Sequence, residues 1–252
     1  MKRIALALLL LMGALMPLSA ATRTDVNVLE ATENIRYLSQ EITKSYLYLF
    51  ANPKKHEVAT QIQKMLNELV ENIRTISIST SDEDTRNILE FLIYSKDQIE
   101  ELVHEKPDKE KAALMLDYSE TLLEGANSIA KAHSYAFSES EKMLMKGKRI
   151  EYLLERSVKY YIALGVGLGT EINRQQMKRS IEMLEENVKD LEAYPYPPEM
   201  KKNQTGLRAS WEVTKSFFAR EGKIFISSLM LLSSYEMEAV TRQFVLYHRK
   251  AK

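Results

Sequence analysis

Apolar residues recur every three or four positions through most of this chain, which is the pattern of amphipathic helices. In the first half this pattern predicts four helices, which start near residues 28, 58, 82 and 108. Asn52-Pro53 ends the first helix, because proline disfavours helical geometry in the residue before it and cannot donate a backbone hydrogen bond. Ser81 or Asp82 is suited to cap the third helix by accepting hydrogen bonds from its free N–H groups.

The first predicted helix recurs in the second half of the chain. Residues 35–49 read IRYLSQEITKSYLYL, and residues 150–164 read IEYLLERSVKYYIAL, 115 positions later. The same offset relates the other predicted helices and places His133 opposite His248. Any two amphipathic helices resemble each other, but one constant offset across four helices and three turns indicates a duplicated structural unit.

We therefore predict an all-α fold of two tandem up-down four-helix bundles, residues 22–140 and 141–252, because short turns make consecutive helices antiparallel neighbours. No proline lies between residues 108 and 164, so we expect one long helix shared by the two bundles, which would stack them end to end. The alternative is a break at Lys146-Gly147-Lys148 that folds the bundles side by side. A glycine costs a helix only about 1 kcal/mol, so Gly147 does not decide between the two.

Residues 1–21 have the features of a secretory signal peptide. Lys2 and Arg3 precede an apolar run from Ile4 to Met16, and small residues offer cleavage after Ala20 or Ala21. The run is short for a bilayer span of about 20 residues, and an uncleaved anchor is the alternative. We expect an exported, soluble protein of a bacterial periplasm. Cysteine is absent, so no disulfide stabilises it.

Charge and motifs argue against several classes of function. The 35 Lys and Arg residues equal the 35 Asp and Glu residues, so no charge excess attracts nucleic acid or an anionic membrane. No Gly-x-Ser-x-Gly motif is present, and none of the four histidines belongs to a metal-binding pair on one helical face. We expect no catalytic residue, metal site or cofactor. Residues 165–170, GVGLGT, are interpreted as a turn between helices, because a helix and not a strand precedes them.

One polar set on the first helix is the candidate ligand site. Steps of three, four and eight residues bring Arg36, Ser39, Gln40 and Lys44 near one side of the helix. Their guanidinium, hydroxyl, amide and ammonium groups could coordinate a small anion or a carboxylate. The alternative is a solvated polar face. The corresponding residues of the second half are Glu151, Leu154, Glu155 and Lys159, so only the lysine recurs.

The segment Arg36-Tyr37-Leu38-Ser39-Gln40, followed by Lys44, resembles a known sequence signature, Arg-Met-Leu-Ser-Gln-Arg-x-x-Lys. That signature marks the periplasmic domain of type IV pilus methyl-accepting chemotaxis transducers, whose architecture the nitrate/nitrite sensor kinases share. Residues 115–123, MLDYSETLL, resemble the fourth helix of the same family. The chain departs from the signature at Glu41, where the pattern has its second arginine, and at Glu33-Asn34, where it has Ala-Gly.

The resemblance implies a four-helix periplasmic sensor module that has no catalytic activity and is often dimeric. It also implies that the arginine matched by Arg36 binds an anion at a dimer interface, although a carboxylate at Glu41 would repel one. We therefore expect a sensor-like protein that binds a small anionic or carboxylate ligand and signals to a membrane sensor or pilus-associated partner, with a homodimer among the expected states. The alternative is a structural or adaptor protein that binds other proteins without a small ligand.

Overall fold

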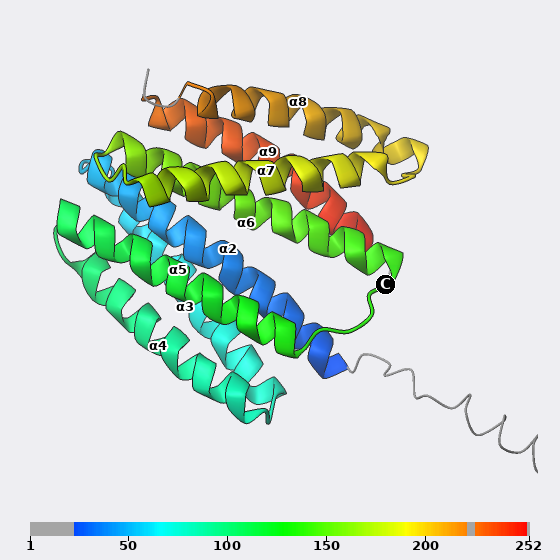
Figure 1. The fold of residues 1–252 in the computed structure, drawn as a ribbon, viewed down its shortest axis with the longest axis horizontal. Helices are drawn as coiled ribbons and strands as arrows, with labels where there is room; N and C mark the ends of the chain where they lie inside the picture. Colours follow the sequence, from blue (N-terminus) through cyan, green and yellow to red (C-terminus); the bar gives the residue numbers. More distant parts are fainter. Residues whose placement is uncertain (1–22, 221–224, 251–252) are drawn as a thin grey trace, which may run out of the picture.

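The computed structural model describes residues 23–220 and 225–250, which are all helical or in short loops (Figure 1). The first four helices are α2 (Arg23–Ala51), α3 (His56–Ser79), α4 (Glu83–His104) and α5 (Lys109–Ala132). They are followed by α6 (Glu139–Gly165), α7 (Glu171–Ala193), the short 3₁₀ helix η1 (Pro198–Met200), α8 (Lys201–Phe218) and α9 (Ser227–Lys250). The all-α prediction is confirmed. The predicted signal peptide lies outside the described residues.

Side-chain caps fix where several helices begin. Asp82 accepts a hydrogen bond from the backbone N–H of Thr85 at 2.7 Å, and Asp108 accepts one from Lys111 at 2.9 Å. Each cap satisfies an N–H group that has no partner within its own helix. The predicted starts of the third and fourth helices are therefore confirmed. Among the described helices, none is long and apolar enough to cross a lipid bilayer.

The predicted long helix shared by the two halves is wrong. α5 ends at Ala132, and α6 begins six residues after His133, at Glu139. Ser138 and Glu141 form a capping box, in which the Glu141 carboxylate accepts a hydrogen bond from the Ser138 N–H at 2.9 Å. This reciprocal cap starts a new helix without proline or glycine. The alternative break at Lys146-Gly147-Lys148 is also wrong, because those residues lie within α6, and the predicted boundary after residue 140 lies in its first turn.

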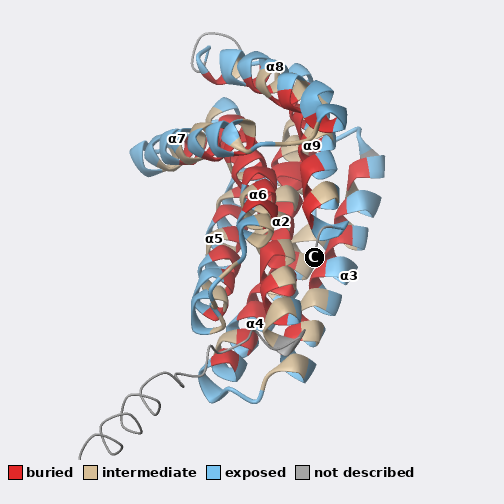
Figure 2. Ribbon diagram, turned by 90° about the vertical axis from the view of Figure 1, so that its right-hand side faces the viewer, coloured by how far each residue is buried: buried red, intermediate tan, exposed pale blue. Residues whose placement is uncertain are grey.

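The two halves lie side by side through their first helices. α2 packs against α3 and α5, α6 packs against α7 and α9, and α2 and α6 pack against each other (Figure 1). Both helices run in the same direction, since Lys44 pairs with Glu155 and Glu33 lies beside Lys148. Buried positions follow the length of α2 and α6 at the centre of the molecule (Figure 2). The end-to-end stacking expected from a shared helix is therefore wrong.

The two distal histidines make matching contacts. His133 Nδ1 lies 3.3 Å from a carboxylate oxygen of Asp25 at the start of α2. His248 Nδ1 lies 3.1 Å from the hydroxyl of Ser140 at the start of α6. Asp25 and Ser140 are themselves related by the 115-residue offset. The duplication stays a prediction, and these equivalent contacts support it.

Gly147 allows α6 to approach α9 closely. A Cβ atom at this position would lie 2.8 Å from Cγ2 of Val245, which is closer than carbon atoms approach without displacement. Valine is branched at Cβ and has few alternative rotamers, so it relieves such a clash poorly. Gly147, which the sequence suggested as a helix break, is therefore a residue at which α6 packs closely against α9.

Two glycine substitutions should consequently have opposite effects on stability. Gly206→Ala on α8 meets no atom closer than 3.8 Å, and it should raise stability by about 0.5–1 kcal/mol because alanine favours the helix. Gly147→Ala gains the same propensity but forces α6 from α9, at a cost of about 1–3 kcal/mol. Thermal unfolding followed by circular dichroism measures both. Equal stabilisation of the two variants would contradict the close approach.

Candidate functional site

The contact between α2 and α6 contains an unusual number of charged side chains. We call these residues the seam; from α2 they are Glu33, Arg36, Gln40 and Lys44, and from α6 they are Lys148, Glu151, Glu155 and Lys159. Lys44 and Lys159 are fully buried, and so are Gln40 and Glu155. Ionisable side chains are rarely buried unless they are paired, so the pairing within the seam determines its chemistry.

Of the four residues predicted to bind a ligand, Arg36, Gln40 and Lys44 belong to the seam, and Ser39 lies beside them. All four contact one another or other protein groups. The Arg36 side chain is 11 % exposed and forms an ion pair with Glu33. Ser39 donates its hydroxyl proton to the Arg36 carbonyl at 2.8 Å, and Gln40 donates to the Ser39 hydroxyl at 2.9 Å. The alternative of a solvated polar face is wrong for Ser39, Gln40 and Lys44, because all three are fully buried. Their role in ligand binding stays a prediction.

Lys44 is neutralised from the opposite half. Its ammonium pairs with the Glu155 carboxylate and lies 4.7 Å from the centre of the Tyr235 ring on α9. Burial acts to lower the pKa of Lys44, but the carboxylates of Glu155 and Glu41 outweigh it and hold that pKa above its ordinary value. Burial acts to raise the pKa of Glu155 above its ordinary value, and Lys44 opposes this.

Lys159 is neutralised by a different helix. Its ammonium donates to the Ser119 hydroxyl at 2.9 Å and to the Glu120 carboxylate at 2.6 Å, and both acceptors lie on α5. Burial lowers the pKa of Lys159 to about 8 despite this partner. Arg156 also pairs with Glu120. Burial acts to raise the pKa of Glu120, but Lys159 and Arg156 together hold it below its ordinary value.

Each buried lysine thus has one close carboxylate, but the two carboxylates come from non-equivalent positions. The 115-residue offset relates Glu155, the partner of Lys44, to Gln40. The same offset relates Glu120, the partner of Lys159, to Tyr235. At each pair of equivalent positions one half has a carboxylate and the other a neutral side chain, and each lysine still has one close carboxylate. The two halves need each other's side chains and are not interchangeable.

The other end of the seam holds two ion pairs, one within α2 and one within α6, in which acid and base occupy opposite positions. Glu33 pairs with Arg36 on α2, and Lys148 pairs with Glu151 on α6 at 3.1 Å. The offset relates Glu33 to Lys148 and Arg36 to Glu151, so each position changes the sign of its charge. Burial raises the pKa of both carboxyl groups, and the neighbouring cations oppose it. Arg36 already has an anion beside it, which is Glu33.

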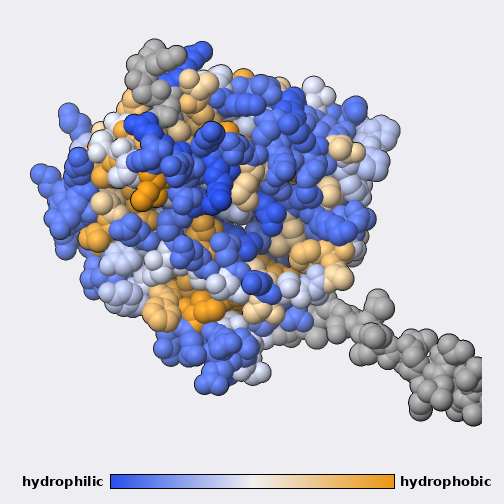
Figure 3. Space-filling view, viewed as in Figure 1, coloured by the Kyte–Doolittle hydropathy of each residue, from blue (hydrophilic) through white to orange (hydrophobic). Residues whose placement is uncertain are grey.

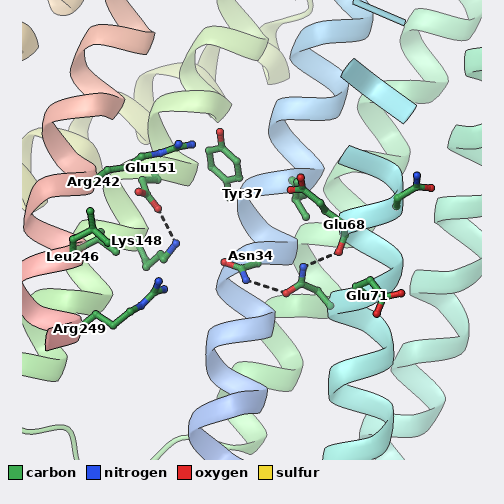
Figure 4. A pocket seen from close by; sticks show the side chains of 13 residues that line it. Asn34, Tyr37, Glu68, Glu71, Lys148, Glu151, Arg242, Leu246 and Arg249 are labelled. Carbon is green, nitrogen blue, oxygen red and sulfur yellow. Dashed lines mark hydrogen bonds and ion pairs between the residues drawn. The ribbon is translucent and has the colours of Figure 1, made fainter. Parts of the chain in front are cut away.

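A groove opens beside this end of the seam. It has a volume of about 670 Å³ and lies between α3 and α9, with α2 and α6 beneath it (Figure 4). Asn34 and Tyr37 reach it from α2, and Lys148 and Glu151 reach it from α6. The seam and the groove therefore share both central helices, and Lys148 and Glu151 belong to both.

The pair Ser119–Lys159 has the residue types of a serine–lysine catalytic pair, in which lysine removes the proton of the attacking hydroxyl. Both side chains are fully buried, and neither lines the groove. A substrate carbonyl has no access to the hydroxyl, so the arrangement is structural. In the part of the chain that the structure describes, no three His, Asp or Glu side chains are placed to hold a metal ion.

Sequence reasoning missed the counter-charges and the groove. By sequence Glu155 is only a mismatch to Gln40, although it is the ion-pair partner of Lys44. The basic groove residues Lys148, Arg242 and Arg249 belong to no sequence motif that would have pointed to a binding site. A comparison of charge at equivalent positions would have found the seam, because Gln40/Glu155 and Tyr235/Glu120 change in a compensating way.

The non-equivalent carboxylates predict a rescue. Glu120→Gln removes the close anion of the buried Lys159 and should cost about 3 kcal/mol of stability. Gln40 already reaches the Ser119 carbonyl at 3.5 Å, so Gln40→Glu should supply Lys159 with an anion in the way that Glu155 supplies Lys44. Gln40→Glu should therefore stabilise the Glu120→Gln variant but destabilise the wild type, where it adds a second carboxylate.

Urea denaturation of the four proteins measures this coupling as a double-mutant cycle. Glu139→Gln, which removes the exposed pair with Lys142, is the control and should hardly change stability. The same effect of Gln40→Glu in both backgrounds would mean that the two carboxylate positions do not serve one lysine.

Glu155 should also make stability depend on pH. Burial raises its pKa in the folded state above the ordinary 4.5, so immediately above pH 4.5 the folded chain holds a proton that the unfolded chain releases. The stability from this group is fully present below the ordinary pKa and is lost as the pH rises through the folded one. Wild type should therefore lose more stability than Glu155→Gln in denaturation experiments as the pH rises above about 5. Parallel pH profiles would contradict the raised pKa.

Comparisons of this chain with protein-family models, curated proteins and solved structures found no match. The resemblance of Arg36–Gln40 to the sensor signature therefore stays a prediction. What supports a function is the geometry of the seam and the groove.

Proposed function

We propose that this chain is a non-catalytic, exported sensor-like protein that binds a small charged ligand and presents its state to a membrane receptor or pilus-linked partner. The observation that supports this most is the ionisable seam between the two halves, with an open groove at its end. Ion pairs inside a protein add little net stability compared with apolar packing of the same volume. Separating the partners of a buried pair is costly, so the two halves can rearrange only into arrangements that keep each buried charge paired.

The ligand would act through α2 and α6. A molecule in the groove touches Asn34 and Tyr37 of α2 and Lys148 and Glu151 of α6, the same helices whose other residues form the seam. It would shift the arrangement of the two halves by binding one arrangement more tightly than the other, since only differential affinity moves an equilibrium. Arg36, Ser39, Gln40 and Lys44 stay the predicted ligand residues, and an anion would reach Arg36 by displacing Glu33.

A structural or adaptor protein is the second candidate. Phe91 and Tyr94 on α4 favour it, because these large side chains are 68 % and 57 % exposed and lie one helical turn apart. The face shown in Figure 3 is mostly hydrophilic, with hydrophobic patches separated by charged or polar side chains. Stable protein interfaces have a continuous desolvated centre, so this face favours the ligand-binding role.

Thermal unfolding in the presence of a panel of anions, carboxylates, amino acids and short peptides tests the proposal. A ligand at about one hundred times its dissociation constant stabilises the native state by about 2.7 kcal/mol, which raises the melting temperature by several degrees. Arg36→Ala should reduce the response, whereas Arg179→Ala, at an exposed position on α7, should not. No response to any compound, with Arg36→Ala behaving as wild type, would refute ligand binding, and capture of partners from periplasm would then test the adaptor role.

A further inference from the structure

The groove between α3 and α9 has walls of opposite charge (Figure 4). On the side of α6 and α9, the three cations Lys148, Arg242 and Arg249 outnumber the carboxylate of Glu151, and Glu68 and Glu71 form the wall on α3. A simple anion would be attracted by one wall and repelled by the other, and the same holds for a simple cation. The groove is therefore complementary to a molecule that carries both charges at separate ends.

Hydrogen bonds fix the two walls relative to α2. On the acidic side, Asn34 donates to the Asn72 side chain at 3.0 Å, and Asn72 donates to the Glu68 carbonyl at 2.7 Å. On the basic side, the Tyr37 hydroxyl donates to Glu238 at 2.6 Å, and Arg242 donates to the same carboxylate oxygen at 2.6 Å. Side chains of α2 therefore connect both walls, which positions the charges before a ligand arrives.

Charges on both walls remain available to a ligand. Among the described residues, neither the Glu68 carboxylate nor the Arg249 guanidinium has an ion-pair partner, and both residues are exposed. Glu71 has only a contact of 3.9 Å with Arg74, between side chains that are both about 70 % exposed. An exposed pair of this kind contributes little, so Glu71 can exchange it for a ligand ammonium.

The separation of the walls favours a peptide over a free amino acid. The two walls stand on helices that share no extensive contact in the described fold, whereas the two charges of an amino acid lie only about 3 Å apart. A peptide of two or three residues separates its terminal charges by roughly 7–10 Å. Leu38, Val245 and Leu246 also line the groove and offer apolar contact to short side chains.

We propose that this groove binds short peptides with free termini, the carboxylate on the Arg242 and Arg249 side and the ammonium on the Glu68 and Glu71 side. The inference rests on the proposed binding function and names the ligand class. The volume of about 670 Å³ is within the range of small-ligand sites and holds a tripeptide.

Isothermal titration calorimetry of the full chain with trialanine tests this assignment. Trialanine should bind, while N-acetyl-trialanine and trialanine amide should each bind about fivefold more weakly or worse, because each loses one terminal charge. The double variant Glu68→Gln/Glu71→Gln should weaken trialanine and leave the acetylated form unchanged. Arg249→Gln should weaken trialanine and leave the amide unchanged.

Glu186→Gln is the matched control, because Glu186 is exposed on α7 at the position that the 115-residue offset relates to Glu71. All substituted side chains are exposed, so the variants should fold, and circular dichroism checks this. No heat from trialanine, equal affinity for the capped peptides, or tighter binding of free alanine would overturn the peptide assignment. The thermal panel can also find a ligand whose affinity is the same in wild type and in the groove variants. In that case the peptide assignment fails, while the proposed binding function stands.

Discussion

A lysine ammonium is not stable in a protein interior without a negative charge beside it, and this chain buries two. Lys44 takes its carboxylate from α6, and Lys159 takes its carboxylate from α5. Both pairs join the two halves, and the first requires α2 to lie against α6 with Glu155 facing Lys44. The remaining helices follow from this constraint, because α3 and α5 cover the other sides of α2, while α7 and α9 cover those of α6.

The same constraint connects stability to function. The central helices present buried charge to each other and polar groups to the groove, so a charged molecule in the groove lies beside Lys148 and Glu151, at the end of the seam. The net charge of this end is balanced, because each half contributes one acid and one base. That balance favours ligands with two opposite charges over inorganic anions, which need an excess of cations.

The sequence was sufficient for the helices and insufficient for the seam. Helix positions follow from local apolar periodicity and from breakers such as Pro53 and caps such as Asp82, so they could be predicted one segment at a time. The break before α6 was missed because a capping box without proline or glycine is a weak signal. The partner of Lys44 is 111 positions away in the sequence, and only the packing of α2 on α6 brings the two together.

The central claim is that the two halves pack side by side through parallel α2 and α6. The chain has no cysteine, so spin labels can be attached at Asn27→Cys and Lys142→Cys, exposed positions in the first turns of α2 and α6 that the repeat makes equivalent. Double electron–electron resonance should give a short, narrow distance, set by a helix spacing of about 8–10 Å plus the two label arms. A distance of at least one helix length, roughly 40 Å, would mean that the halves are stacked end to end and would contradict the account.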